Sequence, residues 1–104
     1  MDRTELLRQV KSRLQEAFGD RLRGVILYGS EARGTAEPDS DIDFLVLLEG
    51  PVDSWQDSGT VIHALYPLVL EIGRHIHTVE VDASTYDNDE VPLYREVRRE
   101  GIPV

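Results

Sequence analysis

The chain has 104 residues, no cysteine and a formal net charge of −9 at pH 7. This length predicts one domain over residues 1–104, and the missing cysteines exclude a disulfide framework or a thiolate metal site. The excess of acidic over basic residues disfavours nucleic acid as the main partner, because nucleic-acid binding depends on neutralising phosphates with positive charge. No apolar run approaches the roughly 20 residues that span a bilayer, and the first residues lack a signal-peptide pattern. We therefore expect a cytoplasmic protein that does not contact a membrane.

Apolar periodicity and turn residues predict alternating helices and strands. The expected elements are a helix at 2–18, strands at 22–28 and 41–48, a helix from 53 or 54 to about 72, a strand at 75–82, a polar loop at 83–89 and a helix from 91 or 92 to about 100. Gly19 and Gly73 are expected to end the first two helices. Pro67 should kink the second helix or divide it, because proline removes a helical hydrogen bond.

This order is typical of an α/β (α+β) sandwich with a small mixed sheet and helices packed on one face. In the second strand, alternation puts one apolar set, Ile42, Phe44, Val46 and Leu48, on the face that would pack on helices. Asp41 and Asp43 fall on the other face, which we expect to be partly open. An exposed sheet face in so small a domain usually receives a ligand or a partner.

The loop between the first two strands begins with Gly29-Ser30 and ends with Asp41-Ile42-Asp43. The two carboxylates point the same way because strand side chains alternate, and they repel each other unless a cation lies between them. Mg²⁺ takes oxygen ligands from one or two carboxylates and from substrate phosphates. Backbone amides and the hydroxyl of the Gly29-Ser30 turn, together with the guanidinium of Arg33, would bind phosphate oxygens. The stretch predicts a site for a metal–nucleoside triphosphate complex.

Each of these residues also has a simpler interpretation. The aspartate pair can begin a strand after a turn, Ser30 can be an ordinary turn serine, and Arg33 can pair at the surface with Glu31 or Glu37. The aspartate pair alone would favour the simpler interpretation. The loop upstream favours the nucleotide site instead, because it adds independent hydrogen-bond donors for phosphate oxygens.

The spacing of Gly29-Ser30, ten residues and Asp41-Ile42-Asp43 resembles the signature of the polymerase-beta-like nucleotidyltransferases. The runs Ser30-Glu31-Ala32-Arg33-Gly34 and Ser40-Asp41-Ile42-Asp43 are similar to the minimal nucleotidyltransferase branch, which includes the MntA-like antitoxins of HEPN/MNT toxin–antitoxin systems. The resemblance implies the polymerase-beta-like nucleotidyltransferase fold and ATP as substrate. Asp41 and Asp43 would then be catalytic ligands of two Mg²⁺ ions, and Gly29, Ser30 and Arg33 would bind the nucleotide.

Nucleotidyltransferases of this kind carry a third carboxylate, which helps to hold the catalytic metal and can accept the proton of the acceptor. It should come from the predicted strand at 75–82, on the face of the aspartate pair. Glu80 is the first candidate and Asp82 the second, and either could instead be a solvated strand residue. His75 and His77 can in principle bind a transition metal, but we expect them opposite Glu80, at an edge or in solvent.

The resemblance implies transfer of AMP from ATP to a hydroxyl group, with release of pyrophosphate. In that family the small members are commonly encoded beside a helical HEPN-domain toxin, which they modify on a tyrosine as antitoxins. One alternative is a binding module that neutralises its partner by contact alone. Another is a nucleotidyltransferase for a small molecule such as an aminoglycoside, although no second lobe is present to enclose one. The sequence leaves the oligomeric state open.

Overall fold

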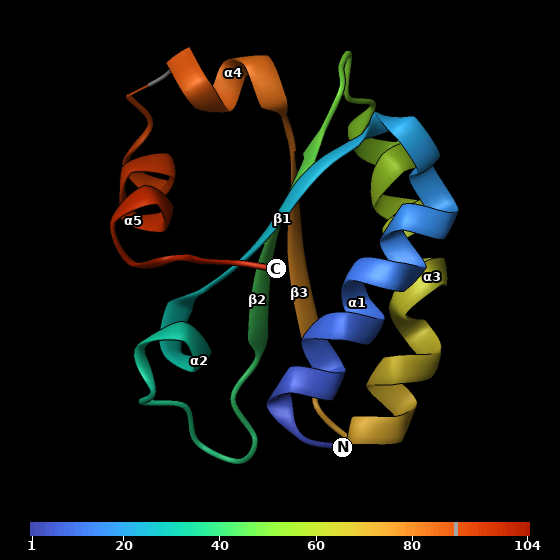
Figure 1. Cartoon of the computed structure of the whole chain (residues 1–104), viewed down its shortest axis with the longest axis vertical. Helices are drawn as coiled ribbons and strands as arrows, with labels where there is room; N and C mark the ends of the chain where they lie inside the picture. The colour runs from blue at the N-terminus through green and yellow to red at the C-terminus, as the bar shows by residue number, and fades with distance from the viewer. Residues whose placement is uncertain (89) are drawn as a thin grey trace.

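In the computed structural model, which describes residues 1–88 and 90–104, a four-stranded sheet separates two layers of helices (Figure 1). The strand order is β3-β2-β1-β4, with β1 at Leu22–Tyr28, β2 at Ile42–Leu48, β3 at Ile76–Asp82 and β4 at Ile102–Pro103. β1 pairs antiparallel with β2 and β4, whereas β2 and β3 are parallel. This is the predicted mixed sheet with an extra strand, because two residues are too few to give β4 a recognisable period.

Two long helices, α1 (Arg3–Phe18) and α3 (Ser54–Ile72), cover one face of the sheet. Each has an aspartate N-cap: Asp2 accepts a hydrogen bond from the amide of Glu5, and Asp53 accepts one from the amide of Gln56. α3 passes through Pro67 as one helix. Within the described residues, no helix is long and apolar enough to cross a membrane.

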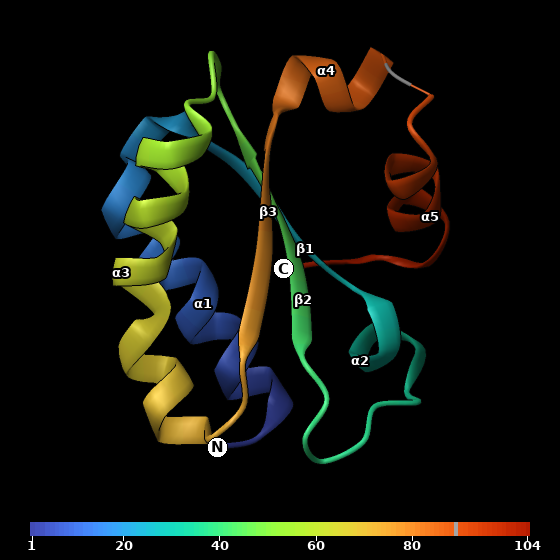
Figure 2. The same cartoon turned by 180° about the vertical axis from the view of Figure 1, so that it is seen from behind.

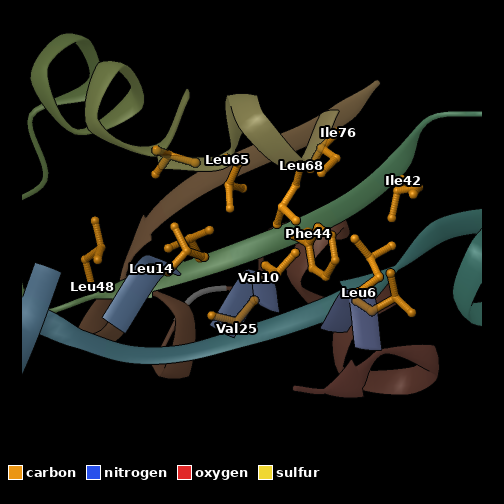
Figure 3. Close-up of a cluster of buried hydrophobic side chains, with 13 residues drawn as sticks. Leu6, Val10, Leu14, Val25, Ile42, Phe44, Leu48, Leu65, Leu68 and Ile76 are labelled. Atoms are coloured by element: carbon orange, nitrogen blue, oxygen red, sulfur yellow. The ribbon is translucent and has the colours of Figure 1, made fainter. Parts of the chain in front are cut away.

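The main core lies between these helices and the sheet (Figure 3). The predicted apolar face of β2 provides its floor, and leucines and valines of α1 and α3 form its roof. Its buried side chains include Val10, Leu14, Ile42, Phe44, Val46, Leu48, Leu65 and Leu68. Burying one such side chain contributes about 1.5–3 kcal/mol, so this layer dominates the stability of the fold.

A second layer covers part of the opposite face: α2 (Gly29–Arg33), α4 (Ala83–Asn88) and α5 (Pro92–Glu100) (Figure 2). It closes a smaller apolar cluster of Tyr28, Leu45, Val81, Tyr86 and Val97. The prediction of a polar loop was therefore wrong over residues 83–88, and residue 89 lies outside the described residues. The helix begins because Asp82 Oδ1 accepts hydrogen bonds from both the amide and the hydroxyl of Ser84.

An ion pair between a buried aspartate and a partly exposed arginine joins the start of α3 to the short 3₁₀ turn η1 (Gly19–Arg21). Asp57 is only 5% exposed, and its two oxygens accept hydrogen bonds of 3.0 and 3.1 Å from the guanidinium of Arg21. The amide of Asp53 donates to the same carboxylate. The hydrogen bond from Arg21 is the largest cause that lowers the pKa of Asp57.

We predict that Asp57→Asn destabilises the protein by about 2 kcal/mol at pH 7, because Arg21 loses a charged partner. The pKa of Asp57 is lower in the folded chain than in the unfolded chain. Its contribution is therefore complete above the unfolded value of about 4 and disappears as the pH falls through the folded value. Urea unfolding should show a difference between wild type and variant that shrinks as the pH falls below about 4. Asp39→Asn, in an exposed turn, is the control.

Candidate active site

The ends of β1 and β2 place the glycine turn against one of the two aspartates. Tyr28 pairs directly with Asp43 across the sheet, and Gly29 follows with φ +74°. A Cβ at Gly29 would lie 2.5 Å from Oδ2 of Asp43, closer than atoms can approach. An alanine here would need a strained backbone conformation and would also force the Asp43 carboxylate to move. The structure brings Gly29 and Asp43 into direct contact.

Ser30 lies in the short helix α2, which begins at Gly29 directly beside that carboxylate. The first amides of a helix have no acceptor within the helix, so they can donate to an anion. Gly34 closes α2 in the left-handed conformation, and its amide donates to the Ser30 carbonyl. The turn thus presents backbone donors beside Asp43, and Ser30 is its first hydroxyl-bearing residue.

Asp41 is exposed and comes one residue before β2. The amide of Ile42 donates to the His75 carbonyl, so the entry to β2 is fixed against the entry to β3. Nδ1 of His75 lies 3.5 Å from Oδ2 of Asp41. The two aspartates therefore stand at the end of the sheet where β1 meets α2 and where β2 and β3 begin.

Arg33 is joined to α5, not to the acidic residues that the sequence suggested as its alternative partners. Its Nη1 donates to Oε1 of Glu100 at 2.9 Å and lies 3.8 Å from Oε1 of Glu96. The pairing arises because α2 and α5 belong to the same layer of helices (Figure 2). The pair is half exposed, so it contributes only about 0–1 kcal/mol.

Arg74 is a positioning residue that the sequence pattern did not single out. Its Nη1 donates to Oε1 of Glu31 at 2.6 Å, and its Nε donates to the carbonyl of Ser40 at 3.0 Å. It thereby ties α2 and the loop before Asp41 to the start of β3. The available signal in the sequence was its place between Gly73, which ends α3, and the start of the predicted strand at 75–82.

The prediction of Glu80 as third carboxylate does not agree with the register. β3 pairs Glu80 with Val46, whose side chain lies in the core under α1 and α3. Glu80 therefore points to the opposite face from Asp43, and its Oε2 is buried without a hydrogen-bond partner among the described residues. The physical reason is the second apolar cluster, which takes Val79 and Val81 and so turns the intervening acid towards the long helices.

Asp82, the second candidate, is also on the wrong face and already has a structural role. Its register partner is Leu48, and its carboxylate caps α4 through Ser84. The side-chain hydrogen bond from Ser84 is the largest cause that lowers the pKa of Asp82. A Cβ at Gly50 would overlap the same carboxylate, so Asp82 lies beside the loop after β2, at the other end of the strand from Asp43.

The β3 residue beside Asp43 is His77. The two are register partners, and Nδ1 of His77 lies 3.3 Å from Oδ1 of Asp43. Within the described residues, no three histidine, aspartate or glutamate side chains converge on one metal position. The sequence expectation that the histidines lie opposite Glu80 agrees with this register, but their proximity to the aspartates was missed.

Tyr28 lies beside Asp43 as its partner across the sheet. It is 8% exposed, and its pKa is raised first by burial and then by the charges of Asp43 and Glu96. The phenol therefore stays neutral across the physiological range.

A glycine turn against a carboxylate, a second carboxylate two residues before it and a mixed sheet of this order define the nucleotidyltransferase class of proteins. The chain belongs to the nucleotidyltransferase domain family, whose model matches residues 7–103. It has the mixed α/β fold of that family.

Three known proteins illustrate the likeness. "Putative protein adenylyltransferase MJ0141" of Methanocaldococcus jannaschii is 37% identical over 49 residues, which are 47% of this chain and 50% of that protein. A toxin–antitoxin crystal structure with AMP-PNP has a TM-score of 0.68 at 20% identity, over 92% of this chain and 69% of that chain. Spectinomycin adenyltransferase AAD(9) from Enterococcus faecialis, with ATP and spectinomycin, has a TM-score of 0.76 at 19% identity, over 99% of this chain and 56% of that chain.

The matched segment thus spans half the length of the curated relative. The two solved structures share the fold with this chain at low identity.

We predict that Gly29→Ala impairs the site more than Gly34→Ala does. Both glycines have positive φ, which costs an alanine about 1 kcal/mol. At Gly34 no described atom lies within 4 Å of the added methyl group, whereas at Gly29 it meets Asp43. Thermal unfolding should show an additional loss of about 0.5–1.5 kcal/mol for Gly29→Ala, the cost of moving the Asp43 side chain off its rotamer, and ATP-analogue binding should weaken in that variant alone. Equal effects of the two substitutions would contradict the close contact.

Proposed function

We propose that this chain is a cytoplasmic adenylyltransferase that transfers AMP from ATP to a tyrosine hydroxyl of a HEPN-domain partner protein, and so acts as an antitoxin. The observation that carries the proposal is the carboxylate of Asp43 seated against the Gly29 turn. Carboxylates that can bind a divalent cation lie here next to hydrogen-bond donors that can bind phosphate. This combination suits a nucleoside triphosphate bound with a divalent cation. The relative named as an adenylyltransferase and the toxin–antitoxin neighbour with AMP-PNP support the choice of AMP and of a protein acceptor.

The chain's own residues would divide the work as follows. Asp41 and Asp43 hold the cation; when bound, Mg²⁺ neutralises the triphosphate and lowers the pKa of the attacking hydroxyl. Gly29 and Ser30 donate hydrogen bonds that orient the phosphates. Arg33 adds a guanidinium, and a triphosphate can compete for it because its half-exposed ion pair with Glu100 is weak.

Small-molecule transfer is the less favoured candidate. Among the described residues, only α2, α4 and α5 border the face beside Asp43. A small substrate needs walls on several sides, whereas a partner protein brings its own surface.

We predict that Asp43→Asn reduces AMP transfer by at least about a hundredfold, because the amide cannot balance a cation. The measurement is the mass of the partner protein after incubation with ATP and Mg²⁺. Asp39→Asn, an exposed acid of the same loop, should leave the transfer unchanged. If Asp43→Asn still neutralises the partner without any mass increment, neutralisation by contact alone replaces the enzymatic function.

The outer face of α3 lies across the sheet from Asp43, so it would bind a part of the partner other than the one that carries the acceptor tyrosine. Trp55 is 91% exposed, and Ile62, Tyr66 and Leu70 continue the same stripe at helical spacing. Beside the stripe runs a groove between α1 and α3, lined by Arg13, Ala17 and His63 among others. Contiguous exposed apolar residues usually mark a protein interface. A second copy with charge −9 would be repelled, so a basic helical protein is the better occupant.

We predict that Ile62→Glu weakens partner binding by at least tenfold, because a buried interface excludes an unpaired charge. Calorimetric titration of the partner checks the affinity. ATP-analogue binding should not change, because α3 lies across the sheet from Asp43. Ser12→Glu, an exposed site on α1, is the matched control. Undiminished partner binding by the Ile62 variant would exclude α3 as the docking surface.

A further inference from the structure

Arg74 contacts two parts of the proposed site at once. Its Nη1 donates to Oε1 of Glu31 at 2.6 Å, and its Nε donates to the carbonyl of Ser40 at 3.0 Å. Glu31 directly follows Ser30, and Ser40 directly precedes Asp41. One guanidinium therefore connects the glycine turn to the start of the aspartate pair.

We propose that Arg74 is a positioning residue for nucleotide binding, which holds the carboxylate of Glu31 away from the place where the triphosphate binds. The inference rests on the proposed function, which assigns the phosphates to Gly29 and Ser30. It gives the ion pair a purpose beyond stability, because the charge of Glu31 is of the same sign as that of the ligand.

The ion pair lies beside the core layer and not on the face of Asp43. Glu31 and Arg74 line one cavity together with Leu6 and Ile42. Leu6 and Ile42 belong to the core under α1 and α3, whereas Asp43 is on the other face, because the side chains of neighbouring strand residues alternate. The carboxylate of Glu31 is thus directed towards the long helices, away from the carboxylate of Asp43.

The backbone fixes the guanidinium that receives Glu31. Arginine presents its N–H donors in a rigid fork, so the hydrogen bond from Nε to the Ser40 carbonyl also sets the direction of Nη1. The strand entry beside it is held as well, because the amide of Ile42 donates to the His75 carbonyl at 3.0 Å. The side chains of Arg74 and Glu31 are only 21% and 20% exposed, so salt screens this pair less than an exposed one.

An unpaired Glu31 would oppose the proposed ligand. Its carboxylate belongs to the residue directly after Ser30, and like charges at short range repel each other. Among the described residues, Arg74 is the only basic residue that forms an ion pair with Glu31. Arg33, two residues further along α2, already pairs with Glu100. Removal of the Arg74 guanidinium would therefore release a negative charge beside the phosphate donors.

Three variants test this inference: Arg74→Gln, Glu31→Gln and the double variant. Calorimetric titration with a non-hydrolysable ATP analogue and Mg²⁺ measures the affinity. We expect Arg74→Gln to weaken binding about tenfold or more, because the charge of Glu31 is no longer balanced. Glu31→Gln and the double variant should both stay within about twofold of the wild type, because the repelling charge is gone.

A merely structural ion pair would give a different pattern. Each single substitution breaks the same pair, so both would weaken nucleotide binding alike, and the double variant would recover nothing. Thermal unfolding measures that structural contribution separately. Arg8→Gln is the matched control, because it removes an ion pair of the same length, 2.6 Å to Glu5, on the exposed face of α1. It should leave nucleotide binding unchanged.

Arg74→Lys replaces Arg74→Gln if the glutamine variant does not fold. A lysine ammonium is a point charge on a flexible stem and cannot reproduce the rigid fork that contacts both Glu31 and the Ser40 carbonyl, so we expect binding to weaken about fivefold. Adding Glu31→Gln to this variant should restore the affinity.

The outcomes separate this inference from the proposed function. Unchanged binding in the Arg74 variants, equal weakening by Glu31→Gln, or no recovery in the double variant would overturn the positioning by Arg74 and leave the proposed function intact. If the wild type does not bind the analogue with Mg²⁺, the proposed function itself fails, and this inference fails with it.

Discussion

The contact between Gly29 and the carboxylate of Asp43 is the constraint on which the site depends. It exists because β1 and β2 are aligned so that Tyr28 faces Asp43, and the turn then begins with the one residue that lacks a Cβ. A shift of the register by one residue would turn Asp43 into the core and bring an apolar side chain to the turn. The large core under α1 and α3 opposes such a shift, since every β2 side chain would change face. Packing on one side of the sheet thus fixes the chemistry on the other.

The second layer of helices determines which β3 side chain lies next to Asp43. Val79 and Val81 are drawn into the cluster beneath α4 and α5, and this leaves His77 at the level of Asp43. Arg33 and Arg74 then connect α2 to α5 and to the start of β3. Residues from four separate segments of the chain are held together in this way, although only the stretch from Gly29 to Asp43 is contiguous.

That difference explains what the sequence could and could not predict. Gly29, Asp41 and the strands around them follow from local spacing and period, which need no knowledge of distant contacts. The position of Glu80 depends on which of two sheet faces receives Val79 and Val81, and both faces are apolar. The helix at 83–88 depends on one cap by Asp82, and β4 on pairing across the whole chain. The partners of Arg33 likewise come from a helix more than sixty residues away.

His75 and His77 also affect the exposed edge of the sheet. β4 covers the free edge of β1, so β3 forms the opposite edge of the sheet. Unprotected edge strands tend to pair with other chains, and polar or charged side chains discourage this. The exposed imidazoles of His75 and His77 therefore place polar groups where β3 would otherwise continue the sheet into a neighbouring molecule. Replacing both histidines with apolar residues would make β3 more prone to pair with a strand of another molecule, and the protein more prone to aggregate.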